Sequence, residues 1–506
     1  MTLPANPPRS VRVLRPIQAF LEVEAAGGIV LILAATVAVS WASSPWAPGY
    51  HHLFGTDLRV GVGGHRVHGS LEHWVNEGLM SLFFFVVGLE IKREWVSGEL
   101  RDRRAAALPV VAALGGMVVP AAIYAAVNHG GAGQVGWGIP MATDIAFALG
   151  VVTLLGHRVP APLKVFLLTL AIVDDIGAIV VIAVFYAGGV GWAWLAAAGA
   201  VAALVAALWR AGVRGRLVFV ALGVALWVCT YRSGVHATIA GVVMAFLTPT
   251  EVGHSLEPRL HPWTTFVIVP LFALANAGVD VTGAGFSHPT AISVGVVVGL
   301  VVGKAAGISA GSWVAVRAGV ARRPAGVRAS QFVGIALLGG IGFTVSIFVS
   351  GLAFPAGGHL EQAKAGVLAG SVVAAVVGAA VLVLAAREDT GDVPGPTGQT
   401  RVMESPDTVT DAVRLLRAEG YHDDVELVDG ELRWGPGGPT CAVEVAEVDR
   451  VYRFEGDSDP GDEMVVFAVR DPGTGALGVL ASAFGPAADP AVLEQLVGLS
   501  RRHGDR

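Results

Sequence analysis

Two adjacent acids, Asp174 and Asp175, lie inside an apolar stretch that covers residues 167–186. A carboxylate at membrane depth costs several kcal/mol unless it is protonated, paired or hydrated. Burial and mutual repulsion both favour uptake of a proton or a cation by such a pair. The pair can therefore exchange a proton for a metal cation. The structural alternative is that neighbouring helices satisfy both acids.

A second acid, Asp144, follows Thr143 and a Gly-x-Pro sequence at residues 138–140. Proline and glycine inside an apolar segment predict a broken helix. The half-helix ends carry partial charges and unpaired backbone groups, which an acid can balance and a cation can use. A simple proline kink, with Asp144 facing water, is the alternative.

Lys304 is a single cation in another apolar segment, residues 296–311. A buried ammonium needs a partner, and one carboxylate of the Asp174–Asp175 pair is the obvious candidate. A purely structural charge balance remains open. Residues 334–344 are rich in glycine and predict a second interrupted helix. Two broken helices in corresponding halves of a chain indicate a midplane ion site between inverted repeats.

Further charged residues lie near the ends of the predicted spans. Glu90 is placed to line an entry funnel that attracts cations, whereas Lys92 and Glu94 fit interfacial charges better. Glu77 lies in the same span, and we give it no separate role.

Three residues could respond to pH. His236 could titrate near neutrality, although a lone helical histidine is more often a packing residue. His261 and Glu257 precede a later span and could tune a pH response, or they could be part of a solvated loop.

The composition predicts a membrane protein. Of the 506 residues, 54% are hydrophobic and 15% are charged, against about 25% charged residues in an average soluble domain. Residues 1–386 hold 23 Lys and Arg against 16 Asp and Glu, whereas residues 387–506 hold 11 against 24. The two regions are therefore chemically different.

The hydropathy pattern predicts an all-α polytopic membrane protein with twelve transmembrane helices. They lie approximately at 20–42, 71–91, 105–127, 134–156, 162–187, 190–210, 215–230, 234–248, 262–281, 289–315, 330–353 and 363–386. With the N-terminus inside, nineteen basic residues lie on the inner side and four on the outer side. This bias places both termini in the cytoplasm.

One outer loop predicts a short β-hairpin. Leu58, Val60 and Val62 alternate before Gly63-Gly64, and Val67 follows. The hairpin at residues 57–68 could pair with a second copy in a homodimer, or it could be a loosely ordered loop.

The chain after residue 386 predicts a linker at 387–402 and a small soluble α/β or α+β domain at 403–506. We expect helices at 406–419 and 490–501 and strands at 425–428, 432–434, 464–469 and 477–482. Its acidity argues against binding to nucleic acid or to anionic lipid.

Residues 12–386 resemble the NhaA-type bacterial sodium/proton antiporters. The resemblance depends on seven ordered motifs: FFFVVGLEIKRE at 83–94, ATDIAFALGV at 142–151, LAIVDDIGAI at 170–179, SGVHATIAG at 233–241, LFALANAG at 271–278, GKAAGIS at 303–309 and GIGFTVSIF at 340–348. The acidic tail lies outside it.

The resemblance implies twelve spans, with the fourth and eleventh broken and crossing near the midplane of the bilayer. It implies that Asp175 is the principal ligand of the transported cation and that Asp174 pairs with Lys304 until the site loads. Thr143 and Asp144 would support the site and compensate charge at the breaks.

The same resemblance places Glu90 at a cytoplasmic entry and links His236, Glu257 and His261 to pH response. Pro258 departs from relatives that carry a histidine there, which puts the pH profile in doubt.

The expected activity is exchange of Na⁺ or Li⁺ for H⁺ across a bacterial inner membrane, with the lipid bilayer as the surrounding partner. It would be electrogenic if more protons than cations move in each cycle. We expect no enzymatic reaction, no resident metal and no cofactor, since a hard cation needs only oxygen donors. A cation channel would conduct without obligatory proton exchange. An ion sensor would bind cations and signal through the tail.

Overall fold

The computed structural model describes residues 11–62, 65–101, 103–281, 289–321, 327–391, 409–428, 431–435, 438–443, 445–454 and 464–483. The chain divides into two compact units. One is residues 19–393, here called the helical unit; the other is residues 394–506 together with residues 1–18. The described residues from 409 onward are here called the tail unit.

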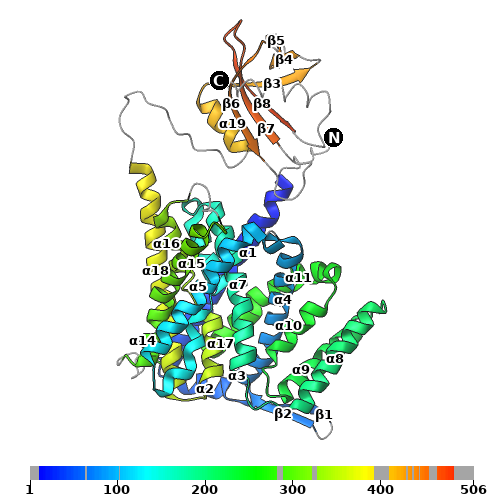
Figure 1. The fold of residues 1–506 in the computed structure, drawn as a ribbon, viewed down its shortest axis with the longest axis vertical. Helices are drawn as coiled ribbons and strands as arrows, with labels where there is room; N and C mark the ends of the chain where they lie inside the picture. The colour runs from blue at the N-terminus through cyan, green and yellow to red at the C-terminus, as the bar shows by residue number, and fades with distance from the viewer. Residues whose placement is uncertain are drawn as a thin grey trace. The chain divides into compact units, whose positions relative to one another are not determined.

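The first part of the chain is mostly helical (Figure 1). The α-helices are α1 (Val11–Ala42), α2 (Ala47–Phe54), α3 (Leu71–Trp74), α4 (Met80–Ser97), α5 (Arg103–Val127), α6 (Ile145–Leu155), α7 (Ala161–Phe185), α8 (Trp192–Arg210), α9 (Arg216–Arg232), α10 (Thr238–Leu247), α11 (Thr250–Trp263), α12 (Val269–Asn276), α14 (Ala291–Val298), α15 (Lys304–Arg317), α16 (Ala329–Leu338), α17 (Phe343–Ala353) and α18 (Gly358–Gly391). Short π-helical turns are η1 (Val75–Leu79), η5 (Thr264–Ile268) and η6 (Gly299–Gly303), and 3-10 turns are η2 (Glu99–Arg101), η3 (Ala132–Met141) and η4 (Gly156–Arg158).

Within the described ranges, six helical runs are long and apolar enough to cross a membrane, and three bent pairs bring the number to as many as nine. The runs are 71–97, 106–127, 162–185, 192–210, 291–317 and 358–386. The predicted spans at 215–230, 234–248 and 262–281 correspond to α9, α10 and η5–α12, which do not reach the length and apolarity of a span by themselves. The polytopic helical character is confirmed.

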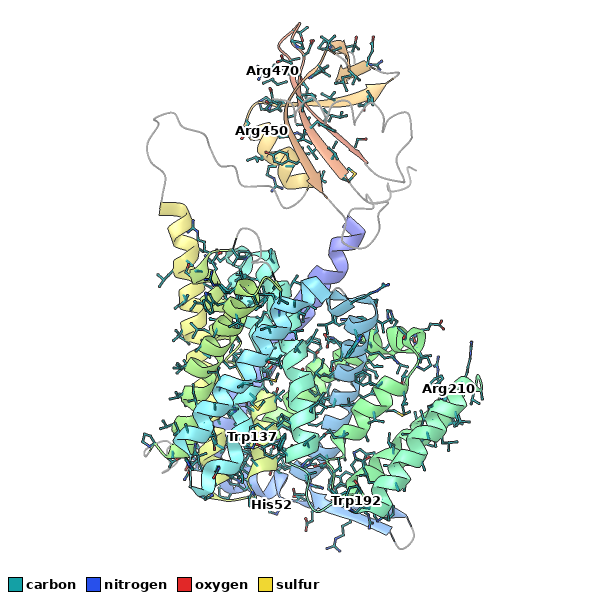
Figure 2. All side chains as sticks on the ribbon, in the orientation of Figure 1. His52, Trp137, Trp192, Arg210, Arg450 and Arg470 are labelled. Carbon is teal, nitrogen blue, oxygen red and sulfur yellow. The ribbon has the colours of Figure 1, made fainter. Side chains whose placement is uncertain are left out.

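Two of the bent pairs are the predicted broken helices. The η3–α6 pair is bent by 46° and the α16–α17 pair by 44°. The two breaks meet, because the Asp144 amide donates to the carbonyl of Ile341 at 2.6 Å. The end of α7 closes on the first break, where the Tyr186 hydroxyl accepts from the amide of Gly138, and Trp137 (labelled in Figure 2) stacks on the Tyr186 ring.

Helices α5 and α15 pack with their backbones almost in contact. A Cβ atom at Gly307 would lie 2.2 Å from the carbonyl oxygen of Gly115. Glycine recurs every four residues at 303, 307 and 311, from the end of η6 into α15, and small residues at this spacing let membrane helices approach closely. Figure 1 shows α5 and α15 on one side of the helical unit, and α8 and α9 at its opposite edge, where Figure 2 labels Trp192 and Arg210 at the two ends of α8.

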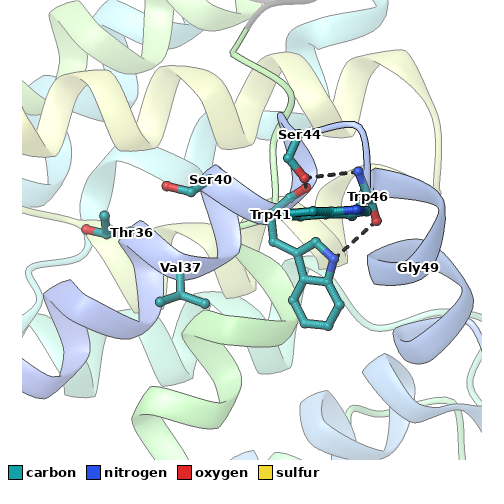
Figure 3. A pocket seen from close by; sticks show the side chains of 7 residues that line it. All are labelled: Thr36, Val37, Ser40, Trp41, Ser44, Trp46 and Gly49. Atoms are coloured by element: carbon teal, nitrogen blue, oxygen red, sulfur yellow. Dashed lines mark hydrogen bonds between the residues drawn. The ribbon is translucent and has the colours of Figure 1, made fainter.

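The chain turns sharply between α1 and α2, which are bent by 116°. The corner is held by local hydrogen bonds, from the Trp41 indole to the Trp46 carbonyl and from the Trp46 amide to the Ser44 hydroxyl (Figure 3). A groove lined by these side chains lies there, and its hydroxyl groups at Thr36 and Ser44 donate back to helix carbonyls.

The predicted hairpin is confirmed. Strands β1 (Asp57–Val62) and β2 (His65–Ser70) pair antiparallel, with Asp57 opposite Ser70 and Val62 opposite His65. The glycine turn at 63–64 lies outside the described residues.

The tail unit is rich in β-structure. It holds α19 (Val409–Ala418) and β3 (Asp423–Val428), β4 (Glu431–Trp434), β5 (Thr440–Ala442), β6 (Glu447–Phe454), β7 (Met464–Arg470) and β8 (Leu477–Ala483), in a sheet of order β5-β4-β3-β8-β7-β6. Only β3 and β8 pair in parallel. Ala412 and Leu416 of α19 cover Val466, Ala468 and Val479.

Strands β5 and β6 were not predicted, because β5 is only three residues long and β6 mixes charged and apolar residues. Helix α18 continues through residues 387–391, which form the first part of the predicted linker. The predicted helix at 490–501 lies outside the described residues.

Removing the Leu416 side chain should destabilise the tail unit. Leu416 is fully buried against the sheet, so Leu416→Ala is expected to cost about 2–5 kcal/mol. In a Cys229→Ser background, the buried Cys441 thiol of the full-length protein should then react much faster with a maleimide. Arg417→Ala is the control, because its ion pair with Asp424 is exposed and contributes little. Equal labelling of both variants would contradict the packing.

Candidate cation-exchange site

The two predicted acids lie in the middle of α7 and are both buried. Asp174 is 0% exposed and Asp175 is 3% exposed. Neighbouring residues of an α-helix point about 100° apart, so the two carboxylates have different surroundings. No hydrogen bond from the described residues reaches Asp175, whereas Asp174 Oδ2 accepts from two side chains.

One of these side chains is the ammonium group of Lys304, which forms an ion pair with Asp174. Both side chains are fully buried. Lys304 is the first residue of α15 and follows the π-turn η6 directly. The predicted pairing of Lys304 with one acid of the pair is therefore present in the structure. The second oxygen of Asp174, Oδ1, is buried and has no partner among the described residues.

The other side chain is Thr143, whose hydroxyl lies 2.6 Å from Asp174 Oδ2 and 2.7 Å from the carbonyl oxygen of Gly339. A hydroxyl group has one proton to donate. Thr143 can therefore bond Asp174 or the second broken helix, but not both at once. This choice connects the exchange pair to the break between α16 and α17.

Asp144 joins the two broken helices. Its Oδ1 accepts from the amide of Phe147 at 3.0 Å and caps the N-terminus of α6. Its Oδ2 accepts from the amide and the hydroxyl of Thr344, at 2.9 and 2.6 Å. A negative charge at two helix starts offsets their positive partial charges. Asp144 is buried, so a kink with this acid facing water is excluded.

The structure brings Glu90 and Glu257 together through a residue that the sequence analysis did not select. Arg93 pairs with Glu257 and lies 3.9 Å from Glu90 and 3.3 Å from Glu94. The spacing of Glu90, Arg93 and Glu94 on one helix face carried this signal, but the position of Glu257 depends on tertiary packing. His261 lies one helical turn after Glu257 on α11.

Glu257 lies on α11, outside the candidate spans, and its side chain is buried. Burial raises the pKa of Glu257, and the positive charges of Arg93, His261 and His254 oppose the increase. Lys92, by contrast, points to the end of α10, where its ammonium group binds the carbonyls of Phe246 and Thr248. This contact gives Lys92 a capping role at a helix C-terminus.

His236 belongs to a separate cluster. Its Nε2 lies 2.8 Å from the carbonyl oxygen of Tyr186 and its Nδ1 lies 3.4 Å from Glu77 Oε1. Glu77 also accepts from the amide of Ala237 at 3.0 Å. The sequence analysis gave Glu77 no role, although an acid inside a span is a functional candidate by default.

Buried carboxylates, a buried ammonium and two interrupted helices that meet at one point are the features of a secondary transporter. The chain matches the family model described as Na⁺/H⁺ antiporter 1 over residues 18–382. A relative named Na(+)/H(+) antiporter NhaA from Anaeromyxobacter sp. (strain Fw109-5) is 45% identical, over 76% of this chain and 95% of its own. A protein of the same name from Bordetella parapertussis is 46% identical, over 75% of this chain and 98% of its own.

The chain therefore belongs to the Na⁺/H⁺ antiporter 1 family, and it is a membrane antiporter of Na⁺ and H⁺ rather than an enzyme. The channel and sensor alternatives are set aside by this membership. The tail after residue 382 is additional to the matched region.

Removing the carboxylate of Asp144 should destabilise the helical unit. In Asp144→Ala three donors lose their acceptor, and each buried unpaired donor costs about 1–3 kcal/mol. Asp144→Asn keeps one acceptor oxygen for the α6 cap. The unfolding temperature of the purified protein should fall in the order wild type, Asp144→Asn, Asp144→Ala, and the exposed Asp57→Ala should match wild type. If Asp144→Ala is as stable as Asp144→Asn, the predicted role of this link is wrong.

Proposed function

We propose that Asp174 and Asp175 are the exchange site of this Na⁺/H⁺ antiporter. The observation that carries the proposal is their burial side by side on α7, with Lys304 paired to one acid only. Asp175 is the principal cation ligand, because no donor from the described residues occupies its carboxylate. Asp174 holds Lys304 while the site is empty and releases it when the cation binds.

Exchange is competitive at this one site. With the site open to one side, Na⁺ displaces protons and takes oxygen ligands from Asp175 and its neighbours, as a hard cation requires. With the site open to the other side, protons displace Na⁺. Li⁺ carries the same charge and the same preference for oxygen, so we include it as a substrate. The exchange needs no cofactor.

Thr143 and Asp144 support the site. The Thr143 hydroxyl switches its hydrogen bond between Asp174 and the carbonyl of Gly339 as the pair opens and closes, which is consistent with its two alternative acceptors. Asp144 keeps the two broken helices together and compensates charge at their ends. Release of a proton from Lys304 as well as from an acid makes the exchange electrogenic; transport rates under an imposed membrane potential test this.

The finer architecture is part of the proposal. Twelve spans form two inverted repeats, and transport occurs by rocking one bundle of helices against the other. The protein lies in the bacterial inner membrane within the lipid bilayer, with both termini in the cytoplasm. Labelling of single cysteines from each side of the membrane tests the orientation.

A homodimer forms through the hairpin. The two-stranded sheet β1–β2 has an unpaired edge on each side among the described strands, and an open edge can accept a strand from a second copy. The mass of the detergent-solubilised protein with and without residues 57–68 tests this.

We divide the chain into an antiporter domain at 1–386, a linker at 387–402 and an acidic domain of unassigned role at 403–506. The end of the family match near residue 382 supports this division. Transport by the full-length protein and by a chain ending at residue 391, compared over a pH series, tests whether the acidic domain regulates exchange.

Four residues adjust the exchange to pH. Glu90 lines the cytoplasmic entry, and Arg93 links it to the buried Glu257 beside His261. His236, with its contacts to Glu77 and Tyr186, contributes at a separate place.

Replacing Asp175 should slow exchange strongly. Asp175→Asn removes the charged ligand, and a hydrogen bond or ligand contact to a charged group contributes about 1.5–3 kcal/mol, so the rate should fall by about 10- to 100-fold or more. The measurement is Na⁺-driven proton movement in vesicles with a pH-sensitive dye. Asp423→Asn, an exposed residue at the start of β3 in the tail unit, is the matched control. Exchange at the wild-type rate in Asp175→Asn would falsify the proposed site.

Replacing Glu257 should move the pH profile. Its raised pKa means that Glu257 takes up a proton at a higher pH than an ordinary glutamate. It becomes charged as the pH rises through that pKa, and only then pairs fully with Arg93. Because Glu257→Gln keeps the acid form at every pH, the midpoint of activity should shift upward by about one pH unit.

The charged groups around Glu257 are Arg93 and Glu94 of α4 and His254 and His261 of α11. Glu251→Gln, exposed on the same helix, is the control and should leave the profile unchanged. A downward shift, or the same shift in both variants, contradicts the role of the Arg93–Glu257 pair.

A further inference from the structure

Ile308 occupies a slot with no spare room. It is fully buried on α15, one turn after Lys304. A Cβ atom at Gly116 of α5 would lie 2.8 Å from Ile308 Cγ1, and a Cβ atom at Gly339, at the end of α16, would lie 2.7 Å from Ile308 Cδ1. Real Cβ atoms do not approach other atoms this closely. The side chain therefore fits only because both walls of the slot are glycine.

Both walls of the slot also border the ion pair. The same Cβ position at Gly116 is 3.6 Å from Cδ of Lys304, so the aliphatic part of Lys304 passes over Gly116. The carbonyl of Gly339 is one acceptor of Thr143, whose other acceptor is Asp174. Ile308 thus lies on the helix that carries the ammonium group and packs beside Gly339, whose carbonyl competes for Thr143.

The backbones next to Ile308 are already in close contact, so α15 cannot move closer to α5. A Cβ atom at Gly303 would lie 2.7 Å from Cα of Pro120, and one at Gly307 would lie 2.2 Å from the carbonyl oxygen of Gly115. Helix α15 is therefore already as close to α5 as two backbones can be. Interiors packed this tightly transmit strain instead of absorbing it, so any displacement of Ile308 moves Lys304 relative to Asp174.

We propose that Ile308 is a positioning residue for the Lys304–Asp174 ion pair, held in a slot between Gly116 and Gly339. This inference rests on the proposed exchange site. The slot sets the position of the ammonium group at Asp174 Oδ2, so the empty site is already shaped for the cation that displaces Lys304. A site whose supporting contacts shift by a fraction of an ångström binds its ligand less well.

The test uses two glycine variants, each of which should be restored by a different second substitution at Ile308. The methyl group added in Gly339→Ala would clash with Ile308 Cδ1, and Ile308→Val removes that atom. The methyl group added in Gly116→Ala would clash with Ile308 Cγ1. A valine at position 308 keeps that atom and an alanine lacks it. Valine at 308 should therefore restore Gly339→Ala but not Gly116→Ala, and alanine at 308 should restore Gly116→Ala. A general loss of packing would not produce this atom-specific pattern.

The measurement is Na⁺/H⁺ exchange by the full-length protein in vesicles, over a range of Na⁺ concentration and pH, at equal amounts of folded transporter. Each glycine variant is expected to raise KM for Na⁺ about tenfold and shift the pH profile, with kcat changed by less than about twofold. The matching double variant returns KM to within about twofold of wild type. Gly351→Ala on α17, where added atoms meet open space, is the control and should behave as wild type.

If a glycine variant does not fold, the single variant Ile308→Val still tests the inference. It empties the slot beside Gly339 and should raise KM for Na⁺ about threefold. An unchanged KM in the single variants, or equal restoration by valine and alanine at 308, overturns the inference.

The outcome is distinguishable from failure of the exchange site itself. If Asp174→Asn and Lys304→Ala transport normally, the proposed site is wrong and Ile308 has no pair to position. If those variants are inactive and the glycine variants match Gly351→Ala, only the slot is wrong.

Discussion

The structure of the helical unit depends on one interaction, the buried ion pair between Asp174 and Lys304. Removing two charges from water is costly, and only close contact with further hydrogen bonds offsets the cost. Lys304 must therefore reach α7 from α15, and the glycine-lined contact between α5 and α15 allows this close approach. An ion pair that is only marginally favourable is also one that a cation can replace, as the proposed exchange requires.

The broken helices follow from the same requirement. A continuous helix in a bilayer satisfies its own backbone and offers no ligands. The breaks in η3–α6 and α16–α17 leave backbone groups without helical partners close to the acids. Asp144 accepts hydrogen bonds from Phe147 of α6 and from Thr344 of α17 and so satisfies some of the polar groups there. The Thr143 hydroxyl has one proton and two acceptors, Asp174 of the ion pair and the carbonyl of Gly339 at the second break. Small changes at the ion pair are thereby linked to the junction of the two breaks.

The polar clusters away from the exchange pair have different surroundings. Arg93 gathers three carboxylates of α4 and α11, and His236 joins Glu77 to the end of α7. In the tail unit, α19 covers one face of a six-stranded sheet, and the ion pairs of Arg450 and Arg470 (labelled in Figure 2) are partly exposed.

The sequence by itself determined that residues 174 and 175 are acids in an apolar helix, that Lys304 needs a partner, that two helices are interrupted, and that an acidic β-containing tail follows. These conclusions rest on the cost of charge in hydrocarbon and on the backbone limits of proline and glycine, which are local. The residues alone left open which acid holds Lys304; the family resemblance implied Asp174, and the structure shows that ion pair. Only the tertiary structure decided that Asp144 joins the two breaks, that Arg93 connects Glu90 with Glu257, and that Ile308 fits between Gly116 and Gly339. Each of these contacts joins residues far apart in the chain, and their distances depend on how closely whole helices pack. Short strands such as β5 escaped prediction for the same reason, because pairing with a neighbour and not local pattern makes them strands.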